Sequence, residues 1–348
     1  MKKFLLYALV LAVLFSLTAC GAGNTDEDGE NVYSNLKTTV LTGGDSTSEG
    51  SAGQLFGQYF AERVTDITEG KLSINYHPNG RLGGDVDLIG MTKANRIQIV
   101  VCQTAPAVSF IPEMAVFDLP MVFSQYDGDR IDAVLNGRNE FTAKLSAACE
   151  KAGFHLLGFL QNGTYRLTTA NRNLASLENY KGLHIRTMEN SNQMDFWRAL
   201  GAEPTPLAWA KVYDALKNGD VDAQENAADT CYGASLQDVQ KYLACTDHLL
   251  YCNMICINKD AWDSLDPAYQ AAMEQAAADA IAYMRPLLQE VDAFHKQKLV
   301  ESGMTLIEYD DGFYDSVLAL DGVRALYYYI NNYQTDGLGT LLTEELSK

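Results

Sequence analysis

The chain has 348 residues, a formal net charge of −19 at pH 7, 47% hydrophobic residues and 20% charged residues. This composition is that of a folded globular protein, and the length exceeds one ordinary hydrophobic core, so two domains are expected. The acidic balance excludes nucleic acid and anionic lipid headgroups as partners of a broad surface, because both would be repelled. A small anionic ligand would therefore need a local basic site.

The first 32 residues indicate export. Residues 1–19 join Lys2 and Lys3 to a short apolar segment, which is typical of a signal peptide and too short for a membrane span. The tetrapeptide that ends at Cys20 looks like a bacterial lipobox, so we expect Cys20 to carry a lipid; an ordinary signal peptide with a chance cysteine is the alternative. Residues 20–32 predict a flexible tether from an extracytoplasmic membrane anchor.

Six further cysteines follow Cys20. An even number in an exported protein could form disulfides. However, their spacing is irregular, and several lie in apolar runs, as Cys102 does, where cysteine acts as a small buried hydrophobic residue. We therefore favour free, buried thiols. Cys252 and Cys256 have no histidine pair at ligand spacing, so no metal site is predicted.

The first half of the chain alternates strands and helices. A short strand at 38–41 precedes a helix with apolar residues at helical spacing over 55–64. A strand at 72–76 is followed by a Pro-Asn-Gly turn and a helix that Asp85 opens near its positive end. The apolar run at 98–102 predicts a buried parallel strand. This alternation predicts an α/β domain.

A second α/β set begins near residue 162. Strands are expected at 184–186 and 221–224, and helices at 191–200 and 207–218, with Trp209 on the second helix. The alternation of strands and helices predicts another sheet with helices packed against it.

The last third predicts connections between the two domains. Residues 248–258 read as a strand that crosses back to the first domain. Residues 266–302 predict a helix of about 55 Å, long enough to lie along both domains. Two shorter helices that meet at Pro286 are the alternative.

Arg166, Arg186 and Asn226 suggest a ligand site. The planar guanidinium fork of arginine binds a carboxylate through two parallel, charge-assisted hydrogen bonds. Arg186, Gln103 and Asn226 all lie at or just past the carboxyl ends of predicted strands. Ligands bind there in open α/β sheets, so the sequence predicts a site for a small organic anion.

Several segments, in order, resemble the extracytoplasmic solute-binding proteins of tripartite ATP-independent periplasmic (TRAP) transporters, of the dicarboxylate- and sialate-binding type. The likeness covers nearly all of the chain after the tether. It is carried by the segments LGGD at 82–85, FDLPMVF at 117–123, NGTYR at 162–166, NYKGLHIR at 179–186, PTPLAWAKVYDAL at 204–216 and GDVDAQEN at 219–226.

The resemblance implies an α/β, two-lobed, periplasmic-binding-protein-like fold with crossing strands and a long helix that bridges both lobes. Lobe I would comprise 33–162 with 250–290, and lobe II would comprise 163–249 with 291–348. The protein would be a monomer without cofactors that delivers its ligand to TRAP membrane subunits.

The same resemblance implies roles for four residues. The arginine that matches Arg186 forms a bidentate pair with the ligand carboxylate, and the asparagine that matches Asn226 binds the same group. The residue at Arg166 lies beside them, and the one at Gln103 reads hydroxyls or a second polar group of the ligand.

The residues themselves leave alternatives open. Arg166 either contacts the ligand or positions Arg186 through a shared carboxylate such as Glu225. Trp209 either packs on the ligand or belongs to the core of its helix. Asp85 and Glu49 either receive sugar hydroxyls or are solvated loop acids.

The polar first-lobe candidates favour a sugar acid such as a uronate over a C4-dicarboxylate. The sequence departs from the family at Met188 and Ala227, where prolines are expected, and it lacks an arginine that sialic-acid-binding relatives carry near Pro106. Carboxylate capture is compatible with these departures, whereas sialic acid is disfavoured.

A lipoprotein hydrolase is the competing class of function. The chain has five histidines and lacks a Gly-x-Ser-x-Gly elbow, a His-Glu-x-x-His motif and a phosphate-binding loop. We therefore expect no enzyme activity. A binding protein that serves an ATP-driven importer or a membrane sensor is a further alternative.

Overall fold

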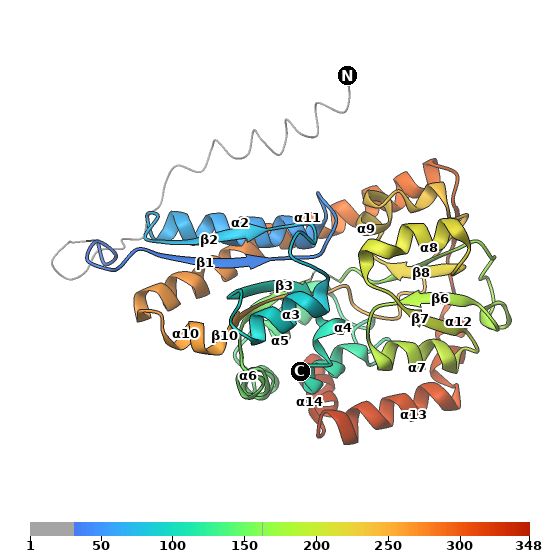
Figure 1. The fold of residues 1–348 in the computed structure, drawn as a ribbon. Helices are drawn as coiled ribbons and strands as arrows, with labels where there is room; N and C mark the ends of the chain where they lie inside the picture. The colour runs from blue at the N-terminus through green and yellow to red at the C-terminus, as the bar shows by residue number, and fades with distance from the viewer. Residues whose placement is uncertain (1–30, 162) are drawn as a thin grey trace.

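The computed structural model describes residues 31–161 and 163–348. The predicted signal peptide, Cys20 and the tether up to residue 30 lie outside this part. Two β-sheets, each covered by helices, form two lobes that lie side by side (Figure 1). This arrangement confirms the expected two-lobed α/β fold.

Lobe I is built on a five-stranded sheet in the order β2-β1-β3-β10-β4. Strands β1, β2 and β3 are parallel, whereas β10 runs antiparallel to both of its neighbours. The strands are β1 (Thr39–Gly44), β2 (Leu72–His77), β3 (Ile99–Gln103), β4 (Phe154–Leu160) and β10 (Asn253–Asn258). The late strand β10 thus inserts between two early ones, which ties the second half of the chain into lobe I.

Helices of lobe I form because their apolar residues recur at helical spacing. On α2, Phe56, Phe60 and Val64 lie four positions apart and are fully buried, and α2 packs against α11. Gly84 caps α3, which begins at Asp85 as expected. The helices are α2 (Ala52–Ile67), α3 (Asp85–Lys93), α4 (Thr104–Ala107), η1 (Pro112–Asp118), α5 (Gly128–Leu135), α6 (Glu140–Ala152) and α10 (Lys259–Asp263).

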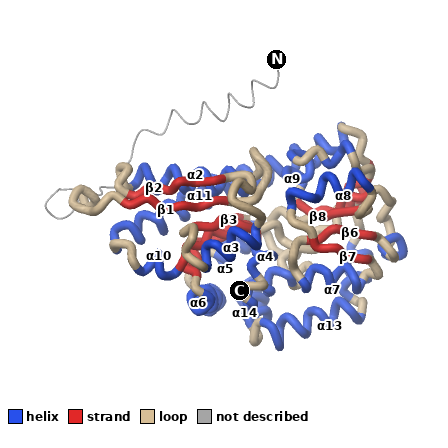
Figure 2. The backbone as a smooth tube through the Cα atoms, in the orientation of Figure 1, coloured by secondary structure: helices blue, strands red, loops and turns tan. Residues whose placement is uncertain are grey.

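Lobe II is built on a six-stranded sheet in the order β11-β9-β5-β8-β6-β7. Figure 2 labels three neighbouring strands of this sheet, β8, β6 and β7. Its strands are β5 (Leu167–Ala170), β6 (His184–Thr187), β7 (Glu203–Pro206), β8 (Ala223–Asn226), β9 (Tyr242–Ala244) and β11 (Thr305–Ile307). Its helices are η2 (Leu177–Tyr180), α7 (Ser191–Ala199), η3 (Trp209–Lys211), α8 (Val212–Asn218), α9 (Ala228–Gly233), η4 (Leu236–Asp238), α12 (Asp311–Leu318), α13 (Asp321–Tyr329) and η5 (Ile330–Gln334).

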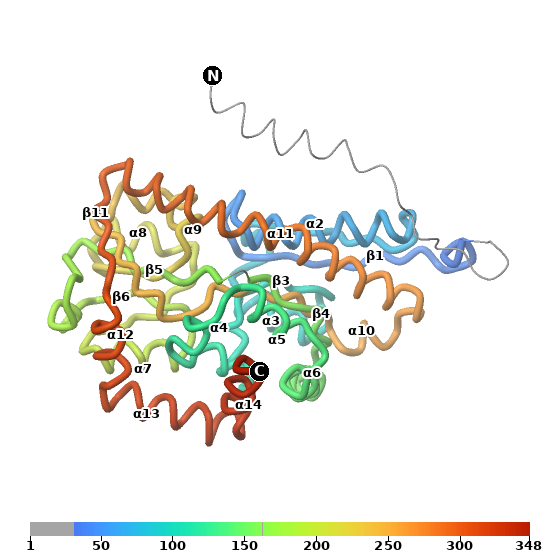
Figure 3. The backbone as a smooth tube through the Cα atoms, turned by 180° about the vertical axis from the view of Figure 1, so that it is seen from behind, coloured from blue at the N-terminus to red at the C-terminus, as the bar shows by residue number. Residues whose placement is uncertain are grey.

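One helix, α11 (Pro267–Glu301), runs along both lobes (Figure 3). It packs on α2 and β4 of lobe I and on α9 of lobe II. At 1.5 Å per residue its length is about 52 Å. The helix continues through Pro286, so the alternative of two shorter helices is wrong.

Three local predictions differ from the structure. Strand β10 begins at Asn253 rather than at 248, and β8 ends at Asn226 rather than at 224. Trp209 lies on the short 3₁₀ turn η3 before α8 rather than within a longer helix. These shifts matter because they place Asn226 as the last residue of its strand and Trp209 in the connection that follows β7.

The C-terminal helix α14 (Leu338–Ser347) corrects the predicted lobe boundaries. It packs against α5, α6 and η1 of lobe I, although 291–348 was assigned entirely to lobe II. The physical reason is its apolar face: Leu338, Leu342 and Leu346 recur every four residues and are buried in the core shared with these helices.

The six cysteines after Cys20 are all buried and free, as favoured from their apolar surroundings. Within the described residues, every helix is too short or too polar to cross a lipid bilayer.

Candidate functional site

Arg186 is a buried cation with an unpaired donor. It lies on β6, and its side chain is only 2% exposed. Its Nε and Nη2 both donate to the carbonyl oxygen of Leu207, at 2.9 and 2.6 Å. Among the described residues, Nη1 has no hydrogen-bond partner. Burying an unpaired charge is costly, so the site is suited to an anion that supplies the missing partner.

The surroundings of Arg186 lower its pKa to about 10. Burial is the main cause and the charge of Arg166 adds to it, whereas Glu225 and Asp85 act in the opposite direction. The guanidinium therefore remains charged at neutral pH.

Arg166 is equally buried, but each of its three guanidinium nitrogens has a protein partner. Its Nε and Nη2 bind the carboxylate of Glu225 on β8, with Nη2 at 3.0 Å from Oε1. Nη2 also lies 3.2 Å from the Glu225 carbonyl oxygen. Its Nη1 donates to Oε1 of Gln103, the last residue of β3 in lobe I. Arg166 thus joins the two lobes, and its charge is neutralised inside the protein.

His248 completes the surroundings of Glu225. Its Nε2 lies 3.7 Å from Glu225 Oε2, its Nδ1 lies 3.1 Å from Thr246 Oγ1, and its ring stacks on Phe196. Burial and the neighbouring charge of Arg166 lower the pKa of His248 to about 3, so this ring is neutral. Sequence reasoning did not single out His248, because no partner lies near it in the chain at metal or catalytic spacing.

Trp209 lies between Arg186 and lobe I. The Arg186 guanidinium lies over the indole ring, 5.7 Å from its centroid. The indole Nε1 donates to Ser48 Oγ at 2.9 Å, in the loop that follows β1. The Trp209 side chain is half-buried. It therefore spans the lobe interface, and it also packs against the lobe II core that includes Val212 and Leu216 of α8.

Asn226 is buried at the end of β8, directly opposite Leu167 on β5. Its Oδ1 accepts from the backbone N–H of Ala227 at 3.2 Å. Its neighbours in the chain and across the sheet, Glu225 and Leu167, bring it beside the Arg166 cluster. Asn226 and Arg186 thus lie at or near the carboxyl ends of β8 and β6, whereas Arg166 directly precedes β5, which runs antiparallel to β8.

Asp85 and Glu49 differ in their relation to this cluster. Asp85 opens α3 and accepts from Ser46 Oγ at 2.6 Å. Burial raises its pKa to about 6, while Ser46 and the charge of Arg186 oppose that shift. Glu49 is exposed in the loop after β1, and no contact in residues 31–161 and 163–348 joins it to the arginines. The assignment of Glu49 to the site stays a prediction, and its loop leaves the side chain exposed.

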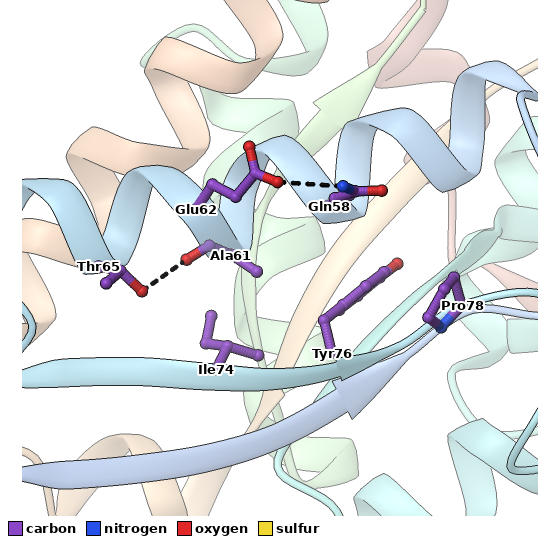
Figure 4. Close-up of a pocket in the computed structure, with 7 residues that line it drawn as sticks. All are labelled: Gln58, Ala61, Glu62, Thr65, Ile74, Tyr76 and Pro78. Atoms are coloured by element: carbon purple, nitrogen blue, oxygen red, sulfur yellow. Dashed lines mark hydrogen bonds between the residues drawn. The ribbon is translucent and has the colours of Figure 1, made fainter.

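A separate hollow lies between α2 and β2 of lobe I (Figure 4). It has a volume of about 360 Å³ and is lined by Gln58, Ala61, Glu62, Thr65, Ile74, Tyr76 and Pro78. It contains no cation. The Tyr76 hydroxyl donates to Asp45 at 2.7 Å, so it already has a partner within the protein. This hollow does not offer the chemistry of an anion site.

Residues 43–312 match the family described as bacterial extracellular solute-binding protein, family 7. A solute-binding protein of Roseobacter denitrificans is 29% identical over 282 residues, which cover 81% of this chain and 85% of that protein. The matching family and the related structures are solute-binding proteins and not enzymes, in agreement with the expectation from the sequence.

Two solved structures resemble the chain over most of its length. One is the sugar acid binding protein DctPAm from Advenella mimigardefordensis in complex with galactonate, with a TM-score of 0.81 and 26% identity, covering 89% of this chain and all of that one. The other is a TRAP periplasmic solute-binding protein from Sulfitobacter with bound β-D-galacturonate, with a TM-score of 0.80 and 25% identity, covering 88% of this chain and all of that one. The chain therefore belongs to the family 7 extracellular solute-binding proteins, the binding proteins of TRAP transporters.

Proposed function

We propose that the protein captures a small organic carboxylate between its lobes and delivers it to a TRAP membrane transporter. The single observation that carries this proposal is that Nη1 of the buried Arg186 has no hydrogen-bond partner among the residues that the structure describes. A ligand carboxylate that bound there would supply both the missing acceptor and the missing negative charge. Asn226, at the end of β8, would donate its side-chain amide to the same carboxylate.

In this proposal Arg166 acts as a support and not as the main anchor. Its Glu225 and Gln103 contacts use most of its donors. It would hold β5, β8 and the end of β3 in place around the ligand. This assignment follows the alternative in which Arg166 acts through Glu225.

We further propose that the ligand is a sugar acid such as a uronate. Asp85 presents carboxylate oxygens from the lobe I side, and Gln103 lies on the same side. A carboxylate acceptor suits the hydroxyl donors of a sugar acid and repels the second carboxylate of a C4-dicarboxylate. The complexes of related proteins with galactonate and galacturonate support this preference.

Capture would occur by closure of the lobes on a ligand first held by Arg186 and Asn226. Closure removes water and so strengthens each charge-assisted hydrogen bond. Part of that gain is offset by the desolvation of the charged groups, so we expect micromolar or tighter affinity, about −8 kcal/mol. Lipidation at Cys20 would hold the protein at the extracytoplasmic membrane surface near the transporter.

The test is thermal melting of the protein against a panel of uronates, aldonates, C4-dicarboxylates and neutral sugars, with Arg186→Ala alongside. We expect stabilisation by sugar acids that is lost in the variant. Stabilisation by C4-dicarboxylates alone would contradict the ligand class. Equal stabilisation of the variant would contradict the role of Arg186.

A further inference from the structure

Asp229 makes a hydrogen bond from lobe II to a helix of lobe I. It lies on α9, three positions after Asn226, and is 7% exposed. Its Oδ2 accepts from the backbone N–H of Ala52 at 3.1 Å. Ala52 is the first residue of α2, a helix of 16 residues that belongs to the other lobe.

Helix α2 has no cap of its own at this end. Ser51 occupies the N-cap position but its side chain makes no capping hydrogen bond, and the first turn contains no acidic residue. The first N–H groups of a helix lack intrahelical acceptors and carry a partial positive charge. The Asp229 carboxylate supplies both an acceptor and a negative charge, which are what a capping residue normally provides.

Lobe II holds the Asp229 carboxylate in position for this contact. Its Oδ1 accepts from the backbone N–H of Thr230 at 2.7 Å and lies 3.2 Å from Thr230 Oγ1. Thr230 Oγ1 in turn lies 3.0 Å from the hydroxyl of Tyr251, and the Arg166 guanidinium lies over the Tyr251 ring at 5.9 Å. The carboxylate is therefore oriented by the same cluster that surrounds the proposed ligand site.

We propose that Asp229 is a positioning residue that couples ligand capture to lobe closure, by capping α2 only when the lobes are together. This inference rests on the proposed function. Asn226 ends β8 and Asp229 lies in the first turn of α9, so only two residues separate them. A ligand that orders Asn226 also orders the cap, and a formed cap holds α2 of lobe I against the occupied site.

A cap of this kind changes affinity without touching the ligand. It raises the fraction of molecules in the closed, binding-competent state, and the apparent dissociation constant falls in inverse proportion to that fraction. Loss of the cap should therefore weaken the binding of every ligand by the same factor. Removal of an N-cap acid should raise the apparent dissociation constant about five- to thirtyfold.

The experiment compares the protein with Asp229→Ala and Asp229→Asn, and with Asp238→Ala as the control. Asp238 is an exposed acid of the same lobe. Dissociation constants and dissociation rates are measured for glucuronate and galactonate, and the radius of gyration is measured by small-angle X-ray scattering with and without ligand. The scattering separates closure from ligand contact.

For Asp229→Ala we expect a larger radius of gyration and faster ligand dissociation. The affinities for glucuronate and galactonate should fall by the same factor. Asp229→Asn should lose less affinity than Asp229→Ala, because its amide oxygen still accepts the hydrogen bond. It should still lose some, because the amide carries no charge. The Asp238→Ala control should match the unmodified protein.

Two results would overturn the proposal. Unequal losses of affinity for glucuronate and galactonate would mean that Asp229 contacts the ligand directly. An unchanged radius of gyration in Asp229→Ala would mean that the cap does not hold the lobes together. If no acid binds even the unmodified protein, the proposed function fails, and the radius of gyration of the ligand-free proteins alone decides whether the cap exists.

Discussion

Arg166 and Arg186 are the same residue type, are buried to the same extent and come from the same sheet, yet they differ in their partners. Arg166 binds a carboxylate and a glutamine of the protein. Arg186 binds one carbonyl oxygen with two of its nitrogens and leaves Nη1 free within the described residues. Burial is therefore the same for both arginines, and the inventory of hydrogen-bond partners is what distinguishes Arg186, the proposed ligand-binding residue, from Arg166.

Sheet register explains the difference. Strand β5 runs antiparallel to β8 and pairs Thr168 with Glu225, so Arg166 lies near an acid on the neighbouring strand. Strand β6 pairs Arg186 with Gln224 on β8 and with Thr205 on β7, neither of which carries a charge. The sheet thus neutralises one arginine internally and leaves the other without a charged partner in the paired positions of its neighbouring strands.

Arg166→Ala should produce the largest effect, and on stability. It would leave Glu225 buried without its cation, which costs about 3–5 kcal/mol of unfolding free energy. Urea unfolding measures this loss. The double variant Arg166→Met with Glu225→Gln should be less destabilised than the single variant, because no buried charge remains. A single-variant loss below about 1 kcal/mol would show that the pair does not support the fold.

Arg186→Ala should instead affect binding. The substitution should reduce the free energy of ligand binding by about 2–5 kcal/mol. The ligand-free variant should melt within a few degrees of the unmodified protein, because no carboxylate of the protein loses its partner. Calorimetric titration and melting curves measure the two quantities. Arg198→Ala, at an exposed arginine of α7 paired with Asp195, is the control and should bind normally. Equal losses of stability in the two arginine variants would remove the distinction between them.

Two buried carboxylates, Glu225 and Asp118, also differ in whether their partners are charged. Glu225 has an arginine partner, whereas Asp118 of lobe I accepts hydrogen bonds from the side-chain amides of Asn190, Asn192 and Gln193 of lobe II, at 2.7, 3.1 and 3.3 Å. Burial raises the pKa of Asp118 to about 6 despite these bonds. Asp118 is thus protonated at a higher pH in the folded state than in the unfolded state.

For a carboxyl whose pKa is raised on folding, the stabilising contribution is complete below the unfolded pKa and is lost as pH rises through the folded one. The free energy of unfolding should therefore fall between pH 4 and 7, by up to about 3 kcal/mol from Asp118. Asp118→Asn should show a shallower fall over this range in urea titrations at several pH values. Parallel curves for the two proteins would contradict the raised pKa.

Trp209→Phe should have the smallest effect. It keeps an aromatic ring over Arg186 but removes the hydrogen bond to Ser48 across the lobes. One hydrogen bond of this kind contributes about 1 kcal/mol, so the ligand should bind roughly fivefold more weakly. The control is Trp262→Phe, where the ring stacks on His155 within lobe I. Equal changes in the two variants would show that the interlobe bond has no special part in binding.

Much of the local structure could be predicted from the sequence. Apolar spacing predicted α2, and the Gly84-Asp85 pair marked the start of α3. The long helix through Pro286 and the position of Arg186 on its strand also followed from local patterns. These features depend on residues a few positions apart, so the chain itself contains the information.

What joins the lobes was decided only by the tertiary structure. Arg166 meets Gln103 across 63 positions, Trp209 meets Ser48 across 161, and Asp229 meets Ala52 across 177. Such contacts depend on strand register and on how one lobe lies against the other, which no local pattern encodes. The sequence by itself determined that Arg186, Gln103 and Asn226 would lie at strand ends. Only the fold decided that Glu225 would neutralise Arg166 and that Arg186 would keep an unpaired Nη1 among the described residues.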